Sequence, residues 1–375
     1  MSHLLLTGAT GLLGRYMMRD LLTKGASLAV LVRKSRKYAP WERIEAAMRT
    51  WERELGRSLP RPVVLSGDIS AGDFTLPKDE LTWARENCTG LIHNAASLSF
   101  VTTGRHAEPY RTNVDGTRYV LEFCRDANIR QFFHVSTAYV CGMRSGKVLE
   151  SELNVGQEFA NCYEESKVES EEMVRNSPDL DLVTVFRPAI IIGDSQSGVT
   201  FTYHNFYVML QIAYTLVNGM GSPNFTSKTS AQMVQFNVDG SERKNLVPVD
   251  WVSEAMTRIM VDPQLHGETY HLTPRLPVNM RLVRDVFEEA VGFYGAGFYG
   301  QGKRRENGHE AEDLFHQHME VYQSYWRDDP EFDCSNTRRA LPDLPCPHVD
   351  RSMLLRLSKV AIANRFSWKD AVVKK

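Results

Sequence analysis

The sequence predicts an α/β fold built on a doubly wound parallel sheet, with a smaller, mostly helical substrate domain towards the C-terminus. Three observations support this prediction. Short apolar runs alternate with longer helical patterns through the first half of the chain, as in successive βαβ units. A glycine-rich turn directly follows the first apolar run. After residue 194 the alternation stops, and an aromatic stretch is followed by polar, irregular sequence.

The predicted strands are short and rich in Val, Ile, Leu or Phe, as expected for strands that are covered on both faces. They are His3–Thr7, Ser27–Val32, Pro62–Leu65, Gly90–His93, Phe132–Ser136 and Leu182–Phe186. The helices predicted between them are Leu12–Lys24, Trp41–Leu55, Tyr110–Ala127 and Tyr163–Asn176. Right-handed crossovers between parallel strands place all the carboxyl ends at one edge of the sheet, where ligands bind.

The second half of the chain is predicted to contain a second unit. Its predicted elements are an aromatic helix at Phe201–Val217, a polar loop at 219–242, a strand and helix within Asn245–Met260, and an amphipathic helix at Arg351–Arg365. The predicted division assigns residues 1–195 to the sheet domain, with 245–262 returning to it, and residues 196–244 and 263–375 to a substrate-binding domain.

The composition excludes several classes of protein. With 42% hydrophobic and 24% charged residues, the 375-residue chain is typical of soluble globular proteins. A net charge of −2 provides no basic field, so nucleic acid is not an expected partner. No apolar run approaches the ~20 residues that span a bilayer, and the first residues lack the regions of a signal peptide. The six cysteines have no metal-ligand spacing, which predicts reduced thiols in a cytoplasmic protein without a metal site.

The stretch LLLTGATGLLGRYMM predicts a dinucleotide site. Gly8, Gly11 and Gly14 follow a predicted strand and open a predicted helix, so backbone N–H groups and the positive helix end can meet a pyrophosphate. A glycine pattern alone is weak, but its place between the first strand and the first helix supplies the context that this fingerprint requires.

The end of the second strand indicates which dinucleotide is bound. NAD sites usually have a carboxylate there for the ribose 2′-hydroxyl, whereas this chain has VLVRKSRK, in which Arg33 comes first. A guanidinium suits a 2′-phosphate, so NADP(H) is the predicted cofactor, and a solvated basic loop is the alternative. Asp68 follows the third strand and is a candidate acceptor for the adenine amine.

A candidate catalytic pair lies in NCYEESKVESEEM. Tyr163 and Lys167 are four residues apart in a predicted helix, so their side chains share one face. A tyrosine has a pKa near 10, and bringing it to roughly 7 takes about 4 kcal/mol, which a neighbouring cation and the cofactor's charge can supply. Thr137, at the end of the fifth strand, is predicted to hydrogen-bond the substrate oxygen. The glutamates of the same helix are predicted to face solvent and the positive helix start. They are Glu164, Glu165, Glu169, Glu171 and Glu172.

The same spacing recurs at Tyr299 and Lys303, with Gly300 and Gly302 between them. Each glycine costs about 1 kcal/mol in a helix interior. This second pair is therefore not predicted to be catalytic. The surrounding stretch, Gly292–Gly308, is predicted to be a mobile loop.

The chain resembles the extended short-chain dehydrogenase/reductases over roughly residues 1–275. The resemblance rests on TGATGLLG, GDIS, HNAA, NVDGT, VSTAYVCG, YEESK, RPAIIIGD and NLVPVDWV, in this order. It implies a Rossmann fold and a catalytic triad of Thr137, Tyr163 and Lys167, with Lys167 positioning the cofactor's ribose. Together with the motifs above, it gives the predicted cofactor-binding residues Thr7, Gly8, Thr10, Gly11, Leu12, Leu13, Gly14, Arg33, Arg43, Asp68, Ile69, Asn94, Ala95, Ala96, Asn113, Tyr163, Lys167, Pro188 and Ile190.

Within this group, HNAASLSF, FHVSTAYVCG and RPAIIIGDSQSG look most like the thioester reductases and fatty acyl reductases. That resemblance implies an acyl thioester substrate, carried by coenzyme A or a carrier protein, which NADPH reduces to an aldehyde or an alcohol. A nucleotide-sugar epimerase or dehydratase of the same superfamily is the alternative. The basic end of the second strand and the aromatic helix argue against it. The sequence predicts neither the acyl chain nor the oligomeric state.

Two further features have competing interpretations. The aromatic helix Phe201–Val217 is either one wall of an acyl tunnel or a buried helix of the second domain. His93, at the end of a predicted strand, is predicted to be a core histidine in preference to a catalytic one.

Overall fold

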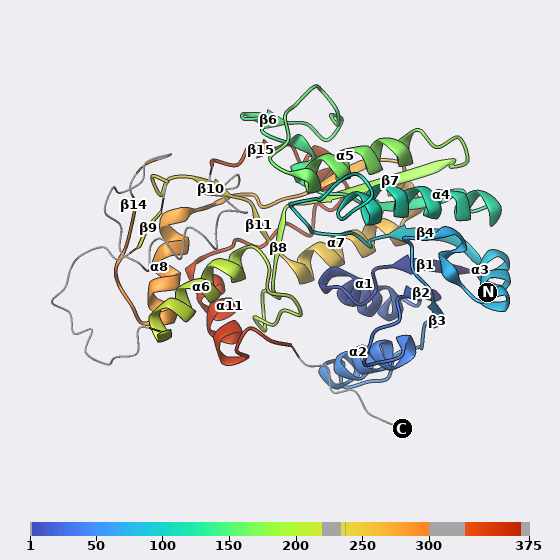
Figure 1. Ribbon diagram of the computed structural model, residues 1–375, viewed down its shortest axis with the longest axis horizontal. Helices are drawn as coiled ribbons and strands as arrows, with labels where there is room; N and C mark the ends of the chain where they lie inside the picture. The colour runs from blue at the N-terminus through green and yellow to red at the C-terminus, as the bar shows by residue number, and fades with distance from the viewer. Residues whose placement is uncertain (1, 220–233, 237, 299, 301–326, 369–375) are drawn as a thin grey trace.

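The centre of the computed structural model is a seven-stranded parallel sheet, in the order β12-β7-β5-β4-β1-β2-β3 (Figure 1). The structure describes residues 2–219, 234–236, 238–298, 300 and 327–368. The strands of the sheet are β1 (His3–Thr7), β2 (Leu28–Val32), β3 (Val63–Ser66), β4 (Cys88–His93), β5 (Gln131–Val135), β7 (Leu182–Pro188) and β12 (Thr269–Leu272). The strand order reverses at β1, which places the ligand-binding edge at the carboxyl ends of β1 and β4.

The predicted doubly wound α/β fold is therefore confirmed. All six predicted strands are present with ends within two residues of those expected, whereas β12 was not predicted. The helices between them are α1 (Leu12–Thr23), α2 (Pro40–Leu55), α3 (Lys78–Asn87), α4 (Gly116–Asp126) and α5 (Cys162–Arg175). A π-helical turn, Arg111–Asp115, precedes α4 and divides the single helix that the sequence predicted there.

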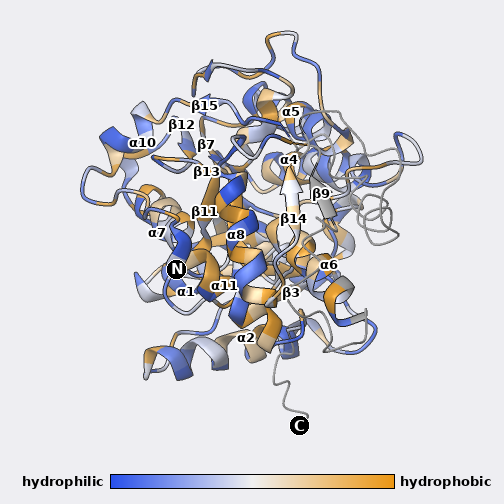
Figure 2. Cartoon of the chain, turned by 90° about the vertical axis from the view of Figure 1, so that its left-hand side faces the viewer, coloured by the Kyte–Doolittle hydropathy of each residue, from blue (hydrophilic) through white to orange (hydrophobic). Residues whose placement is uncertain are grey.

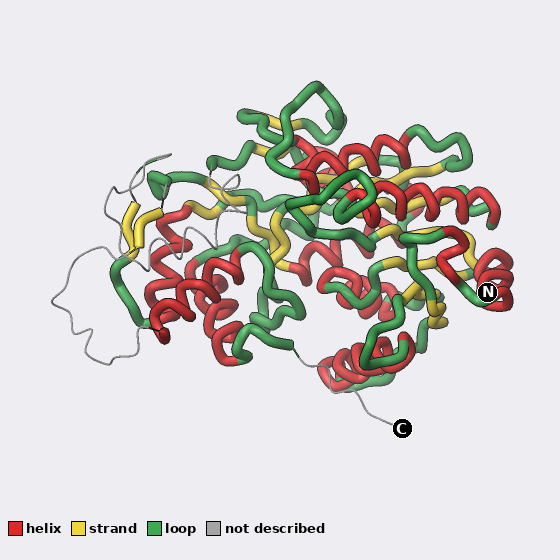
Figure 3. The backbone as a smooth tube through the Cα atoms, in the orientation of Figure 1, coloured by secondary structure: helices red, strands yellow, loops and turns green. Residues whose placement is uncertain are grey.

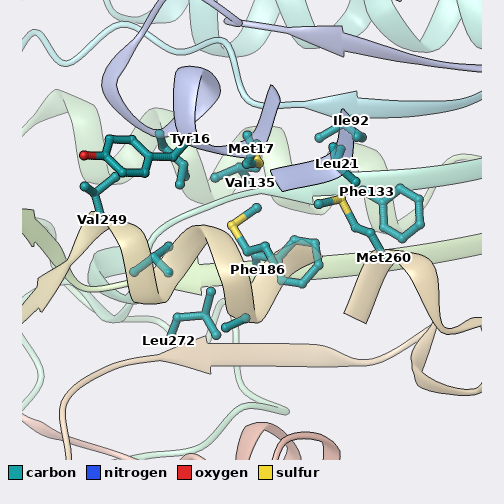
Figure 4. Close-up of a cluster of buried hydrophobic side chains, with 14 of the residues drawn as sticks. Tyr16, Met17, Leu21, Ile92, Phe133, Val135, Phe186, Val249, Met260 and Leu272 are labelled. Atoms are coloured by element: carbon teal, nitrogen blue, oxygen red, sulfur yellow. The ribbon is translucent and has the colours of Figure 1, made fainter. Parts of the chain in front are cut away.

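Helices cover both faces of the sheet. Helices α4 and α5 lie on one face, and α1 and α7 (Val249–Val261) lie on the other (Figures 1 and 3). Between α1, α7 and the sheet lies the largest apolar cluster (Figure 4). It includes Tyr16, Met17, Leu21, Phe133, Phe186, Met260 and Leu272, all 5% exposed or less. Each such side chain stabilises the fold by roughly 1.5–3 kcal/mol, so α7 is held firmly against the sheet.

A second group of helices forms the other end of the molecule. It comprises α6 (Phe206–Gly219), α8 (Met280–Val291) and α11 (Arg351–Ala363), which share an apolar cluster. Figure 2 views the molecule from this end and shows polar and apolar surfaces alternating on α8. The predicted aromatic helix begins at Phe206 and not at Phe201, because Asn205 has a φ of 49°, which no helix residue adopts.

Small two-stranded sheets accompany the central sheet in the described part of the chain. They are β8 (Ile190–Ile192) with β11 (Leu246–Pro248), β10 (Arg243–Lys244) with β13 (Val278–Asn279), β6 (Lys147–Val148) with β15 (Glu331–Phe332), and β9 (Val234–Phe236) with β14 (Ala296–Phe298). Strand β11 and helix α7 confirm the strand and helix predicted within Asn245–Met260.

Some predictions fall partly or wholly outside the described residues. The predicted loop at 219–242 contains β9, and the predicted loop Gly292–Gly308 contains β14; the remainder of both is mostly outside the described residues, as is the second tyrosine–lysine pair. The division into two domains stays a prediction, although the sheet takes β12 from beyond residue 262. In the part of the chain that the structure describes, no helix is long and apolar enough to cross a bilayer.

Candidate active site

A cavity of about 500 Å³ lies at the carboxyl edge of the sheet. Ligand pockets typically measure roughly 300–1,000 Å³, so its size suits a small-molecule site. Every residue of the predicted site lines this cavity except Gly14 and Asn113. The structure thus brings the predicted cofactor and catalytic residues together, while the role of each residue stays a prediction.

The glycine loop brings the start of α1 close to the sheet. Gly8 has a φ of 72°, and a Cβ there would lie 2.8 Å from the backbone nitrogen of Ala95. A Cβ at Gly14 would lie 2.1 Å from the carbonyl oxygen of Gly8. Gly14 therefore permits the tight approach of helix and loop without itself lining the cavity.

The N-terminus of α1 is free to meet an anion. Its N-cap residue is Gly11, and no side chain caps the helix there. Gly11, Leu12 and Leu13 all line the cavity. Because the first N–H groups of a helix have no partner within the helix and carry partial positive charge, this end suits a pyrophosphate. The residues present therefore fit a dinucleotide.

Two arginines lie at the end of β2. The Arg43 guanidinium donates to the carbonyl oxygen of Arg33 and to Thr10 Oγ1, both at 3.0 Å. The side chain of Arg33 is 69% exposed, with Nη1 4.0 Å from Asp68 Oδ2. Asp68 Oδ1 accepts hydrogen bonds from the backbone nitrogen and hydroxyl of Ser70. The structure thus places positive charge beside the loop that suits the pyrophosphate, as a 2′-phosphate requires.

The three predicted catalytic residues meet on one wall of the cavity. Tyr163 and Lys167 come from α5, and Thr137 follows β5 and hydrogen-bonds with Tyr163. Lys167 Nζ donates to the carbonyl oxygen of Val135 at 2.8 Å, and the backbone N–H of Tyr139 donates to Thr137 Oγ1 at 3.3 Å. Strand β5 and its following turn therefore fix the lysine and the threonine in place.

The protonation of the pair differs from the sequence expectation. Burial raises the pKa of Tyr163 to about 12, although its hydrogen bond with Thr137 lowers the pKa in part. Burial lowers the pKa of Lys167 to about 8, while the charge of Glu171 acts in the opposite direction. The expected depression of the tyrosine pKa is thus absent in the protein alone, because burial disfavours the phenolate. Near pH 7, Tyr163 is a neutral acid beside a charged lysine.

Asn113 and His93 do not line the cavity but bond to the elements around it. Asn113 is buried; its Oδ1 accepts from the Ser97 N–H at 2.7 Å, and its Nδ2 donates to Ser166 Oγ at 2.9 Å. It therefore links the loop after β4 to α5. His93 is also buried, with its ring nitrogens 3.0 Å from Thr7 Oγ1 and 3.1 Å from Thr117 Oγ1. Burial lowers its pKa to about 3, in agreement with the prediction of a core histidine.

The acidic side of α5 is only partly exposed. Glu165 is exposed, whereas Glu164 and Glu171 are fully buried, so the prediction that the glutamates face solvent is wrong for these two. Arg187 Nη2 lies 2.6 Å from Glu171 Oε1, and both side chains are 0% exposed. This ion pair joins α5 to β7. Glu171 lies one helical turn after Lys167, and its charge can be buried because the charge of Arg187 compensates it.

The other end of the cavity is largely apolar. It is lined by Leu98, Phe100, Phe206, Met209, Leu246, Met280 and Val283. Helix α6 contributes both to the cavity and to the second core, since Met209 lines the cavity and Leu210 is fully buried in that core; its role as a wall of an acyl tunnel stays a prediction. Tyr139 and Lys244 also line the cavity. Neither was among the predicted site residues, although Tyr139 lies in the motif VSTAYVCG, two residues after Thr137, and Lys244 directly precedes NLVPVDWV.

Comparison with known proteins agrees with the fold. The profile of the male sterility protein family, a family of NAD-binding domains, matches residues 6–256. A nonribosomal peptide synthetase of Aspergillus flavus is 25% identical over 292 residues, covering 72% of this chain and 26% of that protein. A fatty acyl-CoA reductase of Drosophila melanogaster is 26% identical over 287 residues, covering 67% of this chain and 52% of the relative. The chain thus spans about half or less of the length of these curated relatives.

A solved structure shares the whole fold. The terminal R domain from the myxalamid PKS-NRPS biosynthetic pathway has a TM-score of 0.76 and 23% sequence identity, covering 99% of this chain and 92% of that one. The family profile covers the strands from β2 to β7, the glycine loop, α5 and the first part of α7, and with them most of the residues that line the cavity. The chain therefore belongs to the male sterility protein family of NAD-binding domains.

Proposed function

We propose that the protein is an NADPH-dependent reductase that converts acyl thioesters to an aldehyde or an alcohol. The observation that carries this proposal is the meeting of Thr137, Tyr163 and Lys167 in one cavity with a dinucleotide-fitting glycine loop and an apolar wall. The name of the Drosophila relative, a fatty acyl-CoA reductase, supports this substrate class. The match to a nonribosomal peptide synthetase supports delivery by a carrier protein as well as by coenzyme A.

The proposed chemistry follows from the protonation states of Tyr163 and Lys167. NADPH supplies the hydride when bound. Tyr163 is protonated near neutral pH and donates its proton to the thioester oxygen as negative charge develops there. The C–S bond of the resulting hemithioacetal then breaks, which releases the thiol and the aldehyde. Thr137 hydrogen-bonds with Tyr163 and holds the same oxygen. The ammonium group of Lys167 stabilises the negative charge that the proton transfer leaves on the tyrosine. The apolar wall accommodates the acyl chain and excludes water.

The direct test is to mix the protein and NADPH with octanoyl-CoA, follow NADPH absorbance, and identify products by mass spectrometry. Net loss of NADPH with formation of octanal or octanol is the expected result. Turnover of a nucleotide sugar without net loss of NADPH would instead support the epimerase, for which the apolar wall offers few partners to sugar hydroxyls. We also propose a cytoplasmic location, since all six cysteines are free thiols.

The rate of reduction is expected to fall as pH rises through about 8. Burial lowers the pKa of Lys167 to about 8, so its stabilising charge is present below this pH and lost above it. Tyr163, with a pKa of about 12, keeps its proton throughout this range. The measurement is the pH profile of kcat at saturating substrate. A flat profile between about pH 7 and pH 10 would contradict this role of Lys167.

Arg33→Ala is expected to raise the KM for NADPH by about 10- to 100-fold, since hydrogen bonds to charged groups contribute about 1.5–3 kcal/mol. The KM for NADH, which has no 2′-phosphate, is expected to change little. Arg49→Ala is the matched control, because Arg49 is an exposed arginine of α2 that pairs with Glu45. An equal change in both KM values for the Arg33 variant would show that Arg33 does not bind the 2′-phosphate.

A further inference from the structure

The carboxylate of Asp329 joins three segments at the apolar end of the cavity. Lys244 Nζ donates to Asp329 Oδ1 at 2.8 Å. The Tyr139 hydroxyl and the backbone N–H of Asn245 donate to Oδ2 at 2.7 and 2.9 Å. Asp329 is only 4% exposed. Two of these three partners, Tyr139 and Lys244, line the cavity, so Asp329 fixes part of its wall.

The segment that carries Asp329 is attached on both sides. The Asp329 N–H donates to the carbonyl oxygen of Arg243 at 3.0 Å, and Arg327 Nη2 donates to the carbonyl oxygen of Gly142 at 2.7 Å. Beyond it, β15 pairs with β6. Residues 327–333 therefore connect the turn that follows β5 to strand β10, which carries Lys244. This connection holds the charged side chain of Lys244 beside the apolar side chains of Leu246, Met280 and Val283.

Lys244 has one hydrogen-bond donor left over. An ammonium group has three N–H donors and no acceptor. Within the described residues, two are used, by the carbonyl oxygen of Arg327 at 2.6 Å and by Asp329. A buried lysine that lines a cavity and keeps one donor is costly to leave unpaired. The third donor is therefore a specific contact point for a ligand atom.

The position of Lys244 assigns this contact to the substrate and not to the cofactor's phosphates. Lys244 lines the cavity together with Leu246, Met280 and Val283. Strand β10 and helix α8 lie at the opposite side of the molecule from β2, which Arg33 directly follows (Figure 1). Because Asp329 balances the charge of Lys244, the pair has no net charge. A carboxylate would be repelled by Asp329, whereas a neutral oxygen acceptor meets only the N–H donor.

We propose that Lys244 donates a hydrogen bond to a neutral oxygen of the bound thioester, a hydroxyl, carbonyl or amide oxygen, and that Asp329 is the positioning residue for this contact. The inference rests on the proposed function and deepens it. The hydrogen bond from Lys244 favours substrates in which such an oxygen lies within the apolar part of the cavity. This oxygen has two possible sources, the acyl chain and the amide groups of the pantetheine arm.

The test compares thioesters that differ in which of these oxygens they carry. Octanoyl-pantetheine carries the oxygens of the pantetheine arm without the nucleotide of coenzyme A. Octanoyl ethanethiol ester carries neither kind of oxygen, and hydroxyoctanoyl ethanethiol esters, with the hydroxyl moved along the chain, carry only a hydroxyl on the acyl chain. Lys244→Met is expected to lower kcat/KM by about tenfold for the class whose oxygen it binds, equal to about 1.4 kcal/mol. The plain ester is expected to be unaffected. Loss for octanoyl-pantetheine identifies the pantetheine arm, and loss for one hydroxy ester identifies the acyl chain.

Two variants separate substrate contact from structural damage. In the double variant Lys244→Met with Asp329→Asn, the buried carboxylate is removed together with its cation, so no unpaired charge remains. The double variant is expected to lose activity for the same class of thioester as Lys244→Met alone. Lys147→Met is the matched control, because Lys147 pairs with Asp333 of the same segment at 3.5 Å but is 54% exposed and does not line the cavity. Equal losses for every thioester in both Lys244 variants, or no loss for any, would overturn the proposal.

The outcome also separates this inference from the function on which it rests. If the wild-type protein reduces none of the thioesters, the proposed reductase activity fails. Binding of the same thioesters, followed by quenching of protein fluorescence without NADPH, then still tests Lys244. A weaker oxygen-dependent affinity in the Lys244→Met protein is expected, and affinities unchanged between the two proteins would overturn the proposal.

Discussion

Tyr163→Phe is expected to lower the turnover of acyl thioesters by about 100- to 10,000-fold, the range for loss of a positioned general acid. The phenyl ring keeps the packing against Phe100, whose ring centre lies 6.0 Å away. Only the hydroxyl that bonds with Thr137 is removed. NADPH binding is expected to persist, because the glycine loop and the arginines at the end of β2 are unchanged. Steady-state kinetics and NADPH titration by fluorescence measure the two properties separately.

The control for this variant removes a hydroxyl beside the same helix. Tyr110 donates a hydrogen bond to Glu165 of α5, but it does not line the cavity. Tyr110→Phe is therefore expected to retain most of the activity. Near-normal turnover in the Tyr163 variant would remove this tyrosine from the chemistry. Equal losses in both variants would indicate damage to α5 in place of a lost proton donor.

The sequence predicts the catalytic pair because its geometry is local. Four residues of helix place Tyr163 and Lys167 on one face whatever surrounds the helix. Strand β5 could be predicted from its apolar pattern, and with it the position of Thr137 at the ligand-binding edge. Protonation could not be predicted in the same way. The pKa values of the pair depend on burial, which arises from the packing of α5 against β5 and is not visible in a helical pattern.

The contacts at the apolar end of the cavity could not be predicted from the sequence either. Lys244 and Tyr139 are 105 positions apart in the sequence and meet only through Asp329, a further 85 residues along the chain. No periodicity relates these three positions. Likewise, the start of α6 depends on one residue, Asn205, with a positive φ that asparagine adopts more readily than most residues. The apolar pattern continues through this point, so it placed the start of the helix too early.

Arg187→Met is expected to lower the free energy of unfolding by about 3–5 kcal/mol, the range for breaking a buried ion pair. The Arg187 guanidinium makes two hydrogen bonds to Glu171, at 2.6 and 3.1 Å, and one to the carbonyl oxygen of Glu152 at 2.7 Å. Removal of the guanidinium leaves the buried carboxylate without its buried cation, while the partly exposed Arg175 still bonds to it. Urea unfolding followed by circular dichroism measures the change.

The charge on Glu171, and not the packing of Arg187, is expected to account for most of this loss. In the double variant Glu171→Met with Arg187→Met, both charges are replaced by apolar side chains of similar length, so most of the lost stability should return. Arg175→Met is the matched control, since its side chain is 34% exposed and it bonds to the same carboxylate; a loss of about 1 kcal/mol or less is expected. A double variant as unstable as the single one would show instead that the backbone hydrogen bond to Glu152 and the packing of Arg187 hold α5 against β7.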